Sequence, residues 1–349
     1  MASAVTTGIR LRRIAADKLT VTSLCSTRIT VALLAPALAL TIGGCGSARP
    51  AAPMVTPAAP VANVPRTITV RAAGRIVTVL FEDYVAGTAI SEVTPVGETP
   101  RTVERVYEVQ TIVARTYALT HLGRHRAEGF DLCDTTHCQV YEPARLGASR
   151  FTADVRRAAA QTAGEVILYG TRPIDALFHA DCGGHTSSPE QVWGTTPLPY
   201  LRPEPDRARA LTHRSWTVTL TREQLRVALN ADPRTAVGKT LKSLDADPLD
   251  SSGRIAGVRI AGDRQLDIRG DDFRAILNRT LGPKTVQSTR FSIRSTGTTY
   301  VLTGTGYGHG IGLCQQGALA RARLGTPADT ILAGYFPGTA VTRLGGRIP

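Results

Sequence analysis

Two cysteines and two histidines lie close together in one stretch of this 349-residue sequence. Cys133 and Cys138 are separated by four residues, and His137 lies between them. His125 lies eight positions before Cys133. Thiolate sulfur and imidazole nitrogen are ordinary zinc donors, and this spacing lets both sulfurs reach one ion. In an exported protein the two cysteines could form a disulfide instead, and free thiols are the third alternative.

Glycine occupies every second position from 304 to 312, with His309 inside the run. A dinucleotide-binding loop needs a Gly-x-Gly-x-x-Gly spacing, so the run does not indicate one. Strict alternation instead leaves one face of an extended segment bare, so that backbone can approach a ligand closely. We therefore expect His309 to project beside a substrate groove, with a packing role as the alternative.

The elements that position these residues follow from hydrophobic periodicity and turn signals. Expected strands cover 67–72, 75–80, 166–169, 174–180, 217–220, 255–260, 265–268, 290–294 and 299–303. Expected helices cover 102–122, 152–163, 221–230, 271–281, 315–324 and 328–336. Helices and strands mix without regular βαβ alternation. The pattern predicts an α+β fold with a largely antiparallel sheet and a substrate groove.

The first 44 residues are typical of an export signal. A basic flank precedes an apolar run over 29–44, which at 16 residues is short for a membrane span. Cys45 follows Ile42-Gly43-Gly44, which resembles a bacterial lipoprotein box, so we expect Cys45 to be lipidated. The alternatives are an ordinary signal peptide or an uncleaved anchor. A Pro/Ala-rich linker over 45–66 then leads to one domain over 67–349.

The charge balance favours an acidic partner. The chain has 41 basic and 28 acidic residues, a formal net charge of +13. Export and the lack of any zinc-finger, RNP or basic-zipper pattern argue against nucleic acid. An anionic cell wall or membrane surface is the expected partner, and the extracytoplasmic cell envelope is the expected location.

Five stretches, taken in order, form a recognisable set. They are 82–95 (EDYVAGTAISEVTP), 110–118 (QTIVARTYA), 131–141 (DLCDTTHCQVY), 178–186 (FHADCGGHT) and 304–318 (GTGYGHGIGLCQQGA). In this order they resemble the stage II sporulation protein D (SpoIID/LytB-like) family, over residues 67–345. The resemblance implies action on peptidoglycan: some members are lytic transglycosylases that cut glycan strands, and others enhance a cell-wall amidase.

The resemblance places the catalytic carboxyl on Glu92. An extra Thr94 before Pro95 departs from the family pattern, so we expect Glu92 in a loop of altered shape. One carboxyl suffices for a lytic transglycosylase, because the substrate's own C6 hydroxyl replaces water as nucleophile. The pKa of that carboxyl must lie near the working pH, which burial can achieve. The nearest other carboxyls are Glu98, Glu104 and Glu108.

The resemblance implies further site residues. It suggests that Arg115 lines the substrate groove. From the residues themselves, His185 and His309 are further substrate-binding candidates, and Tyr141 and Tyr307 could stack on sugar rings. For Arg115 a structural ion pair is the alternative, and for the two tyrosines a place in the core. The resemblance also implies a structural zinc on Cys133, Cys138 and an upstream histidine, for which His125 is the candidate. A second disulfide, between Cys182 and Cys314, is a further alternative use of cysteine.

Overall fold

The computed structural model describes residues 63–209 and 211–345. The expected export signal, the lipidated Cys45 and most of the expected linker lie outside the described residues. Within them, no helix has both the length and the apolar character needed to cross a membrane.

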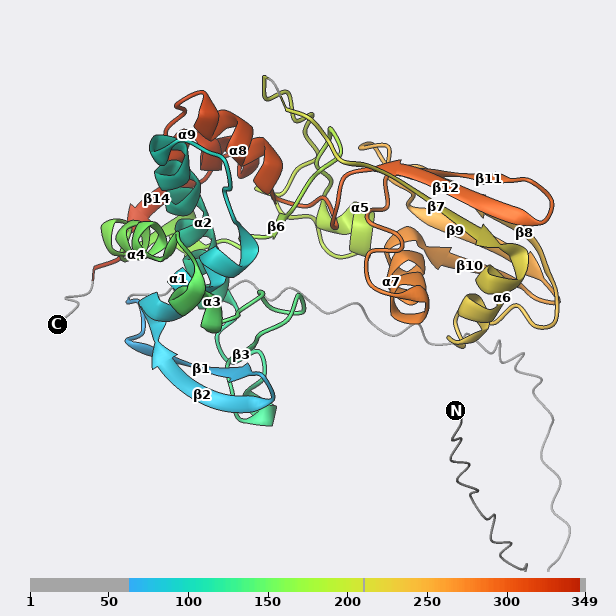
Figure 1. Ribbon diagram of the computed structural model, residues 1–349, viewed down its shortest axis with the longest axis horizontal. Helices are drawn as coiled ribbons and strands as arrows, with labels where there is room; N and C mark the ends of the chain where they lie inside the picture. The colour runs from blue at the N-terminus through green and yellow to red at the C-terminus, as the bar shows by residue number, and fades with distance from the viewer. Residues whose placement is uncertain (1–62, 210, 346–349) are drawn as a thin grey trace, which may run out of the picture. The chain divides into compact units, whose positions relative to one another are not determined.

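A β-hairpin opens the described part of the chain (Figure 1). Strands β1 (Thr67–Ala72) and β2 (Arg75–Leu80) pair antiparallel along their full length, which confirms the expected hairpin and its bounds. Ala73 and Gly74 both have positive φ angles, 48° and 77°, as a two-residue hairpin turn requires. The short β3 (Leu132–Cys133) adds to β1 in parallel, giving the sheet order β2-β1-β3.

Two consecutive helices follow the hairpin. The helix α2 (Pro100–Thr120) is the one expected from periodicity. Its N-cap Thr99 accepts a hydrogen bond from the backbone N–H of Thr102, and Pro100 starts it. The helix α1 (Phe81–Glu92) was not expected, and the prediction of a loop there is wrong. Eight of its twelve residues are buried, so it has no polar face that a periodicity argument could detect.

The middle of the chain departs most from the sequence prediction. A single strand over 174–180 is wrong: only β6 (Phe178–His179) is extended there, and it pairs in parallel with β13 (Leu313–Cys314). The Leu177 N–H donates to the Asp175 carbonyl at 2.8 Å, a tight turn that interrupts any longer strand. A separate sheet of order β14-β4-β5 contains β4 (Glu165–Tyr169), β5 (Arg172–Pro173) and β14 (Ala340–Arg343).

A second hydrophobic core lies between residues 216 and 302. Its two antiparallel sheets have the orders β11-β12-β7 and β10-β9-β8. The strands are β7 (Ser215–Thr221), β8 (Leu241–Ala246), β9 (Gly257–Gly262), β10 (Gln265–Arg269), β11 (Phe291–Ser295) and β12 (Thr299–Thr305). Helices α6 (Arg222–Asn230) and α7 (Gly270–Leu281) pack with them. Thr221 and Gln224 form a capping box at the start of α6.

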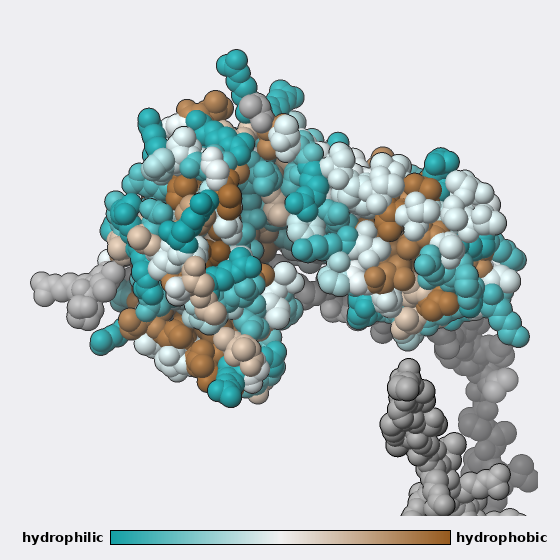
Figure 2. Space-filling model, in the orientation of Figure 1, coloured by the Kyte–Doolittle hydropathy of each residue, from teal (hydrophilic) through white to brown (hydrophobic). Residues whose placement is uncertain are grey.

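The remaining elements are helical. They are α3 (Ala144–Ala148), α4 (Thr152–Gln161), α5 (Pro189–Trp193), α8 (Gln315–Arg323), α9 (Ala328–Tyr335) and the 3₁₀ turn Arg126–Glu128. With parallel pairing confined to β1–β3 and β6–β13 among the described strands, the expected α+β class with largely antiparallel sheets is confirmed. Polar side chains cover most of the face in Figure 2, and apolar ones form several patches, one of them over β1 and β2, where Ile76 and Leu80 are exposed.

Candidate functional site

Glu92 is the last residue of α1, so a helix and not a loop positions it. Its side chain is half-buried. The Val140 N–H donates to its Oε1 at 2.7 Å. Because the hydrogen bond comes from the segment that follows β3, two parts of the chain about 50 residues apart fix one carboxyl group.

The environment of Glu92 suits proton transfer at neutral pH. Burial raises the pKa of its carboxyl to about 7, against the lowering effect of the Val140 hydrogen bond. The charge of Arg145 also lowers this pKa, and that of Glu142 raises it. A carboxyl group with a pKa near the ambient pH can both give and take a proton.

Residues 139–142 hold the Val140 N–H in place through contacts with both helices. The Gln139 amide donates to the Tyr84 hydroxyl at 3.2 Å and to the Ala114 carbonyl at 3.3 Å. The ring of Tyr141 stacks at a tilt on Tyr84, with centroids 5.0 Å apart. A Cβ on Gly87 would lie 2.5 Å from the Tyr141 ring, so glycine is needed there for the close approach. Tyr141 is 4% exposed, and sugar stacking by it stays a prediction.

Arg115 is fully buried in α2 and binds a different carboxylate. Its Nε and Nη2 donate to the two oxygens of Glu82 at 2.9 and 2.6 Å, a bidentate pair. Its remaining donors reach the carbonyls of Glu165 and Ala159 at 3.1 and 3.2 Å. None of its contacts among the described residues is to Glu92. This arrangement matches the structural ion pair, and a substrate contact by Arg115 stays a prediction.

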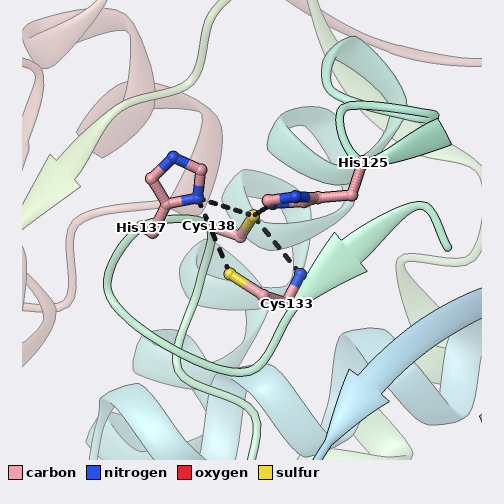
Figure 3. Close-up of side chains that lie close together, drawn as sticks. All are labelled: His125, Cys133, His137 and Cys138. Carbon is pink, nitrogen blue, oxygen red and sulfur yellow. Dashed lines mark hydrogen bonds between the residues drawn. The ribbon is translucent and has the colours of Figure 1, made fainter. Parts of the chain in front are cut away.

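The four side chains of the Cys/His cluster, namely His125, Cys133, His137 and Cys138, converge as Figure 3 shows. The Cys138 Sγ lies 3.5 Å from His125 Nε2 and 3.8 Å from His137 Nδ1. The Cys133 Sγ lies 3.7 Å from the same His137 nitrogen. All four donor atoms lie within 4.8 Å of one another. The structure thus adds His137 to the three residues expected as ligands.

These distances fit a tetrahedral zinc site. Zinc bonds of about 2.3 Å to sulfur and about 2.0–2.1 Å to nitrogen place neighbouring donors about 3.4–3.8 Å apart. His125 Nδ1 lies 2.5 Å from Glu128 Oε1, so a carboxylate orients the ring with Nε2 toward the sulfurs. Burial acts to raise the pKa of the Cys133 thiol, but hydrogen bonds with Thr135, Cys138 and His137 outweigh it and lower this pKa to about 6.

The described cysteines are all free thiols in the structure, so neither of the two expected disulfide pairings is formed in it. Cys182 and Cys314 are nevertheless neighbours. The Cys182 N–H donates to the Cys314 Sγ at 3.2 Å, and the Gly184 N–H donates to the Cys182 Sγ at 3.3 Å. Both side chains are completely buried in the hydrophobic cluster to which α2, α8 and α9 contribute.

The alternating glycines lie against other backbone segments. A Cβ on Gly312 would be 2.2 Å from the Leu177 carbonyl oxygen, and one on Gly310 would be 2.3 Å from the Arg254 guanidinium. His309 uses both ring nitrogens in this packing. Its Nδ1 accepts the Ile311 N–H at 3.0 Å, and its Nε2 donates to the Phe178 carbonyl at 2.9 Å. A substrate contact by His309 stays a prediction.

The last two expected site residues differ in their surroundings. His185 is bound through Nδ1 to the Thr186 carbonyl at 2.7 Å. Tyr307 lines a pocket together with Asp181 and His213, which the sequence analysis did not select. Asp181 lies directly before the Cys-Gly-Gly of a recognised motif, and that position was the one available signal.

Comparisons with known proteins agree with the motif pattern. A family model described as "Stage II sporulation protein" matches residues 71–169, and a "Domain of unknown function (DUF8618)" matches 212–312. The first range contains Glu92 and the Cys/His cluster, and the second contains most of the second core.

Among curated relatives, an uncharacterized protein of Brachyspira hyodysenteriae is 32% identical over 75% of this chain and 66% of its own length. The amidase enhancer of Bacillus subtilis is 27% identical over 67% of this chain. Stage II sporulation protein D of Bacillus subtilis is 27% identical over 75% of this chain and 74% of its own length. The match spans slightly less than two thirds of the Brachyspira protein and 37% of the amidase enhancer. Residues 71–169 of the chain therefore form a domain of the stage II sporulation protein family.

Proposed function

We propose that the protein acts on the peptidoglycan of the bacterial cell wall as a lytic transglycosylase, with Glu92 as acid and then base. The observation that carries this proposal is the half-buried Glu92 carboxyl at the end of α1, whose pKa burial raises to about 7. A glycosidase that activates water needs two carboxyl groups, whereas intramolecular attack by a sugar hydroxyl needs one. The family membership and the similarity to stage II sporulation protein D support the choice of substrate.

In the proposed reaction, protonated Glu92 gives its proton to the glycosidic oxygen as the bond from that oxygen to C1 breaks. The C6 hydroxyl of the same sugar attacks C1, and its proton passes to the Glu92 carboxylate. The products are a free 4-hydroxyl end and a 1,6-anhydromuramyl end, and Glu92 returns to its protonated state. The Val140 N–H keeps the carboxyl oriented through both steps.

The test is the Glu92→Gln variant, incubated with purified glycan strands with and without stem peptides. We expect a loss of anhydromuramyl ends, measured by mass spectrometry, of about 10²–10⁴-fold. Glu108→Gln is the matched control, because burial also raises the pKa of that carboxyl, which pairs with Arg105 at 2.6 Å on α2. Unchanged product formation by Glu92→Gln, or an equal loss in the control, contradicts the proposal.

We further propose that the Cys/His cluster holds one structural zinc ion. The ion would cross-link the 3₁₀ turn and the segment after β3, which supplies the Val140 N–H to Glu92. Elemental analysis of the purified protein should give about one zinc per chain. Cys138→Ser should lower this content, and His185→Gln, a histidine outside the cluster, should leave it unchanged. Zinc near zero with no free thiols in denaturant would establish a disulfide instead.

A second candidate function is a non-catalytic protein that binds peptidoglycan and enhances a cell-wall amidase. The similarity to the amidase enhancer of Bacillus subtilis favours it. Under this alternative, purified protein stimulates an amidase on intact walls, and Glu92→Gln stimulates equally while still binding glycan. Loss of the effect in Glu92→Gln supports the enzyme.

Both functions place the protein in the extracytoplasmic cell envelope, and we propose that a lipid on Cys45 anchors it to the membrane. Two signals usually make such an anchor stable, and the net positive charge of the chain provides the second at an anionic surface. Labelling with radioactive palmitate should mark the full chain and fail with Cys45→Ala. Equal labelling of the variant contradicts the anchor.

A further inference from the structure

A pocket of about 330 Å³ lies outside the Glu92 site. The residues that line it are Ala180, Asp181, Thr212, His213, Arg214, Tyr307 and Gln316. We call it the Asp181 pocket. Its volume is at the lower end of the range for small-molecule sites, which suits one sugar residue better than a long chain. The lining is polar and aromatic, the combination that carbohydrate recognition uses.

The pocket has a rigid frame because two glycine-containing segments lock together. Asp181 and Tyr307 exchange backbone hydrogen bonds at 3.0 and 2.8 Å. Gly306 has a φ of +84°, and a Cβ on it would lie 2.7 Å from the Asp181 carbonyl oxygen. Only glycine allows this approach, so the alternating glycine run fixes the place of the Tyr307 ring. Of the residues in the glycine run over 304–312, Tyr307 is therefore the one whose side chain lines the Asp181 pocket.

A buried carboxylate fixes the opposite wall. Asp181 is 2% exposed, and its Oδ1 accepts the Gly183 N–H at 2.9 Å and lies 2.6 Å from His213 Nδ1. Its Oδ2 accepts the Arg214 N–H at 2.7 Å. With the Nδ1 proton directed at Asp181, the Nε2 of His213 is left to serve a ligand. The carboxylate itself is fully engaged, so it orders the wall and offers no free charge.

The free charge of the pocket is positive. Among the described residues, the Arg214 guanidinium forms no ion pair, and its central carbon lies 5.9 Å from the centre of the Tyr307 ring. A guanidinium beside an aromatic face can bind a carboxylate while the ring contacts the apolar face of a sugar. The Gln316 amide, the Thr212 hydroxyl and His213 Nε2 then serve hydroxyl or acetamido groups.

We propose that the Asp181 pocket binds a carboxylate-bearing amino sugar, such as a muramic acid residue with a free lactyl carboxylate. Arg214 holds the carboxylate, Tyr307 stacks on the ring, and His213 with Gln316 receives the polar groups. This inference rests on the proposed peptidoglycan substrate. It gives Arg214 a carboxylate-binding role, whereas the Arg115 guanidinium is paired with Glu82 in the structure.

The test is calorimetric titration of the full chain with N-acetylmuramic acid. We expect saturable binding that Arg214→Gln weakens at least tenfold, the usual effect of removing one charged hydrogen-bond partner. Arg214 is exposed, so the variant should fold normally. Arg294→Gln, an exposed arginine on β11, is the matched control and should bind as the wild type does. His213→Gln should also weaken binding, because it removes the oriented Nε2.

Two further ligands test whether the pocket recognises the sugar, the carboxylate or both together. N-acetylglucosamine has the sugar without the carboxylate, and D-alanyl-D-alanine has a carboxylate without the sugar. Each should bind at least tenfold more weakly than N-acetylmuramic acid. Equal binding of the dipeptide, unchanged binding by Arg214→Gln, or no saturation by N-acetylmuramic acid overturns the proposal.

The outcome is separable from that of the proposed function. Glu92→Gln should bind N-acetylmuramic acid as the wild type does, because Glu92 does not line the Asp181 pocket. Binding without anhydromuramyl products rejects the transglycosylase and keeps the pocket. Products without Arg214-dependent binding reject the pocket and keep the enzyme.

Discussion

Glu92 and Asp181 are acidic side chains in two regions of the same protein, and the number of hydrogen bonds each accepts separates their roles. Glu92 accepts one backbone N–H, from Val140, and burial outweighs that bond and raises its pKa to about 7. Asp181 is bound by two backbone N–H groups and an imidazole. Burial with a single donor leaves the Glu92 carboxyl able to give and take a proton, whereas three donors hold the Asp181 carboxyl group in a fixed orientation.

The two regions also differ in what holds the donors. The Val140 N–H belongs to a segment that β3 and the Cys/His cluster anchor. Near the Asp181 carboxyl group, Asp181 exchanges backbone hydrogen bonds with Tyr307, and the Gly306 N–H donates to the Arg214 carbonyl at 2.7 Å. These bonds fix the backbone that carries the Gly183 and Arg214 N–H groups. The comparison therefore predicts that the Glu92 site depends on the cluster and that the Asp181 pocket does not.

Metal removal is the largest expected effect. A ligand at 1,000 times its Kd stabilises the folded state by about 4 kcal/mol, so chelation of a bound zinc should lower the free energy of unfolding by about that amount. Hydrogen exchange measures the local consequence. The Val140 amide should exchange at least tenfold faster after chelation, and the Arg214 amide should keep its rate. Equal acceleration of both amides would show that the Asp181 pocket depends on the zinc ion as much as the Glu92 site does.

Asp181→Asn should have the next largest effect. In the variant, an NH₂ group replaces one of the two carboxylate oxygens, so a donor stands where an acceptor was. The NH₂ group then faces either the Arg214 N–H or the His213 Nδ1–H, and that donor loses its acceptor. We expect a loss of about 2–3 kcal/mol in the free energy of unfolding, from urea titration. The pH profile of anhydromuramyl formation should stay unchanged. A shifted profile would show that the two carboxyl groups are coupled.

Parts of the fold follow from local sequence, and other parts do not. The β1–β2 hairpin matched its prediction because residue alternation and the Ala73-Gly74 turn agree. The helix α1 was missed because nearly all its residues are buried and no side chain caps its start. The strand expected over 174–180 failed because a tight turn between Asp175 and Leu177 interrupts it, so that only Phe178–His179 pairs with β13.

The candidate sites divide in the same way. The Cys/His cluster lies within 14 residues, so spacing together with the family resemblance indicated it, although His137 was not counted as a ligand. Glu92 came from the family resemblance, and the hydrogen bond from Val140 became visible only in the structure. Asp181 and His213 are 32 residues apart and join through packing of the glycine run, which no local pattern encodes.

The pH dependence of stability should differ between Glu92→Gln and the wild type. The folded-state pKa of Glu92 is about 7, raised by burial from about 4.5, so the folded state holds a proton that the unfolded state loses between these values. Wild-type stability therefore falls as pH rises from about 4.5 to 7. Glutamine does not titrate. The variant should match the wild type at pH 4 and exceed it by about 3 kcal/mol at pH 8 in thermal unfolding, because each pKa unit corresponds to about 1.4 kcal/mol. A constant difference across this range contradicts the raised pKa.

The smallest expected effect comes from the two charges beside Glu92. The positive charge of Arg145 lowers the pKa of Glu92, and the negative charge of Glu142 raises it. Arg145→Gln should therefore move the alkaline limb of the activity profile to higher pH, and Glu142→Gln should move it to lower pH. Both side chains are exposed, so solvent screening limits each shift to about a few tenths of a pH unit.

These opposite shifts make the pair its own control. A structural disturbance at the Arg145–Glu142 ion pair, whose atoms lie 2.7 Å apart, affects both variants in the same direction. An electrostatic effect on Glu92 reverses sign between them. Neither variant should change binding of N-acetylmuramic acid, because neither residue lines the Asp181 pocket. If both variants moved the alkaline limb in the same direction, the group that titrates in the activity profile would be a residue other than Glu92.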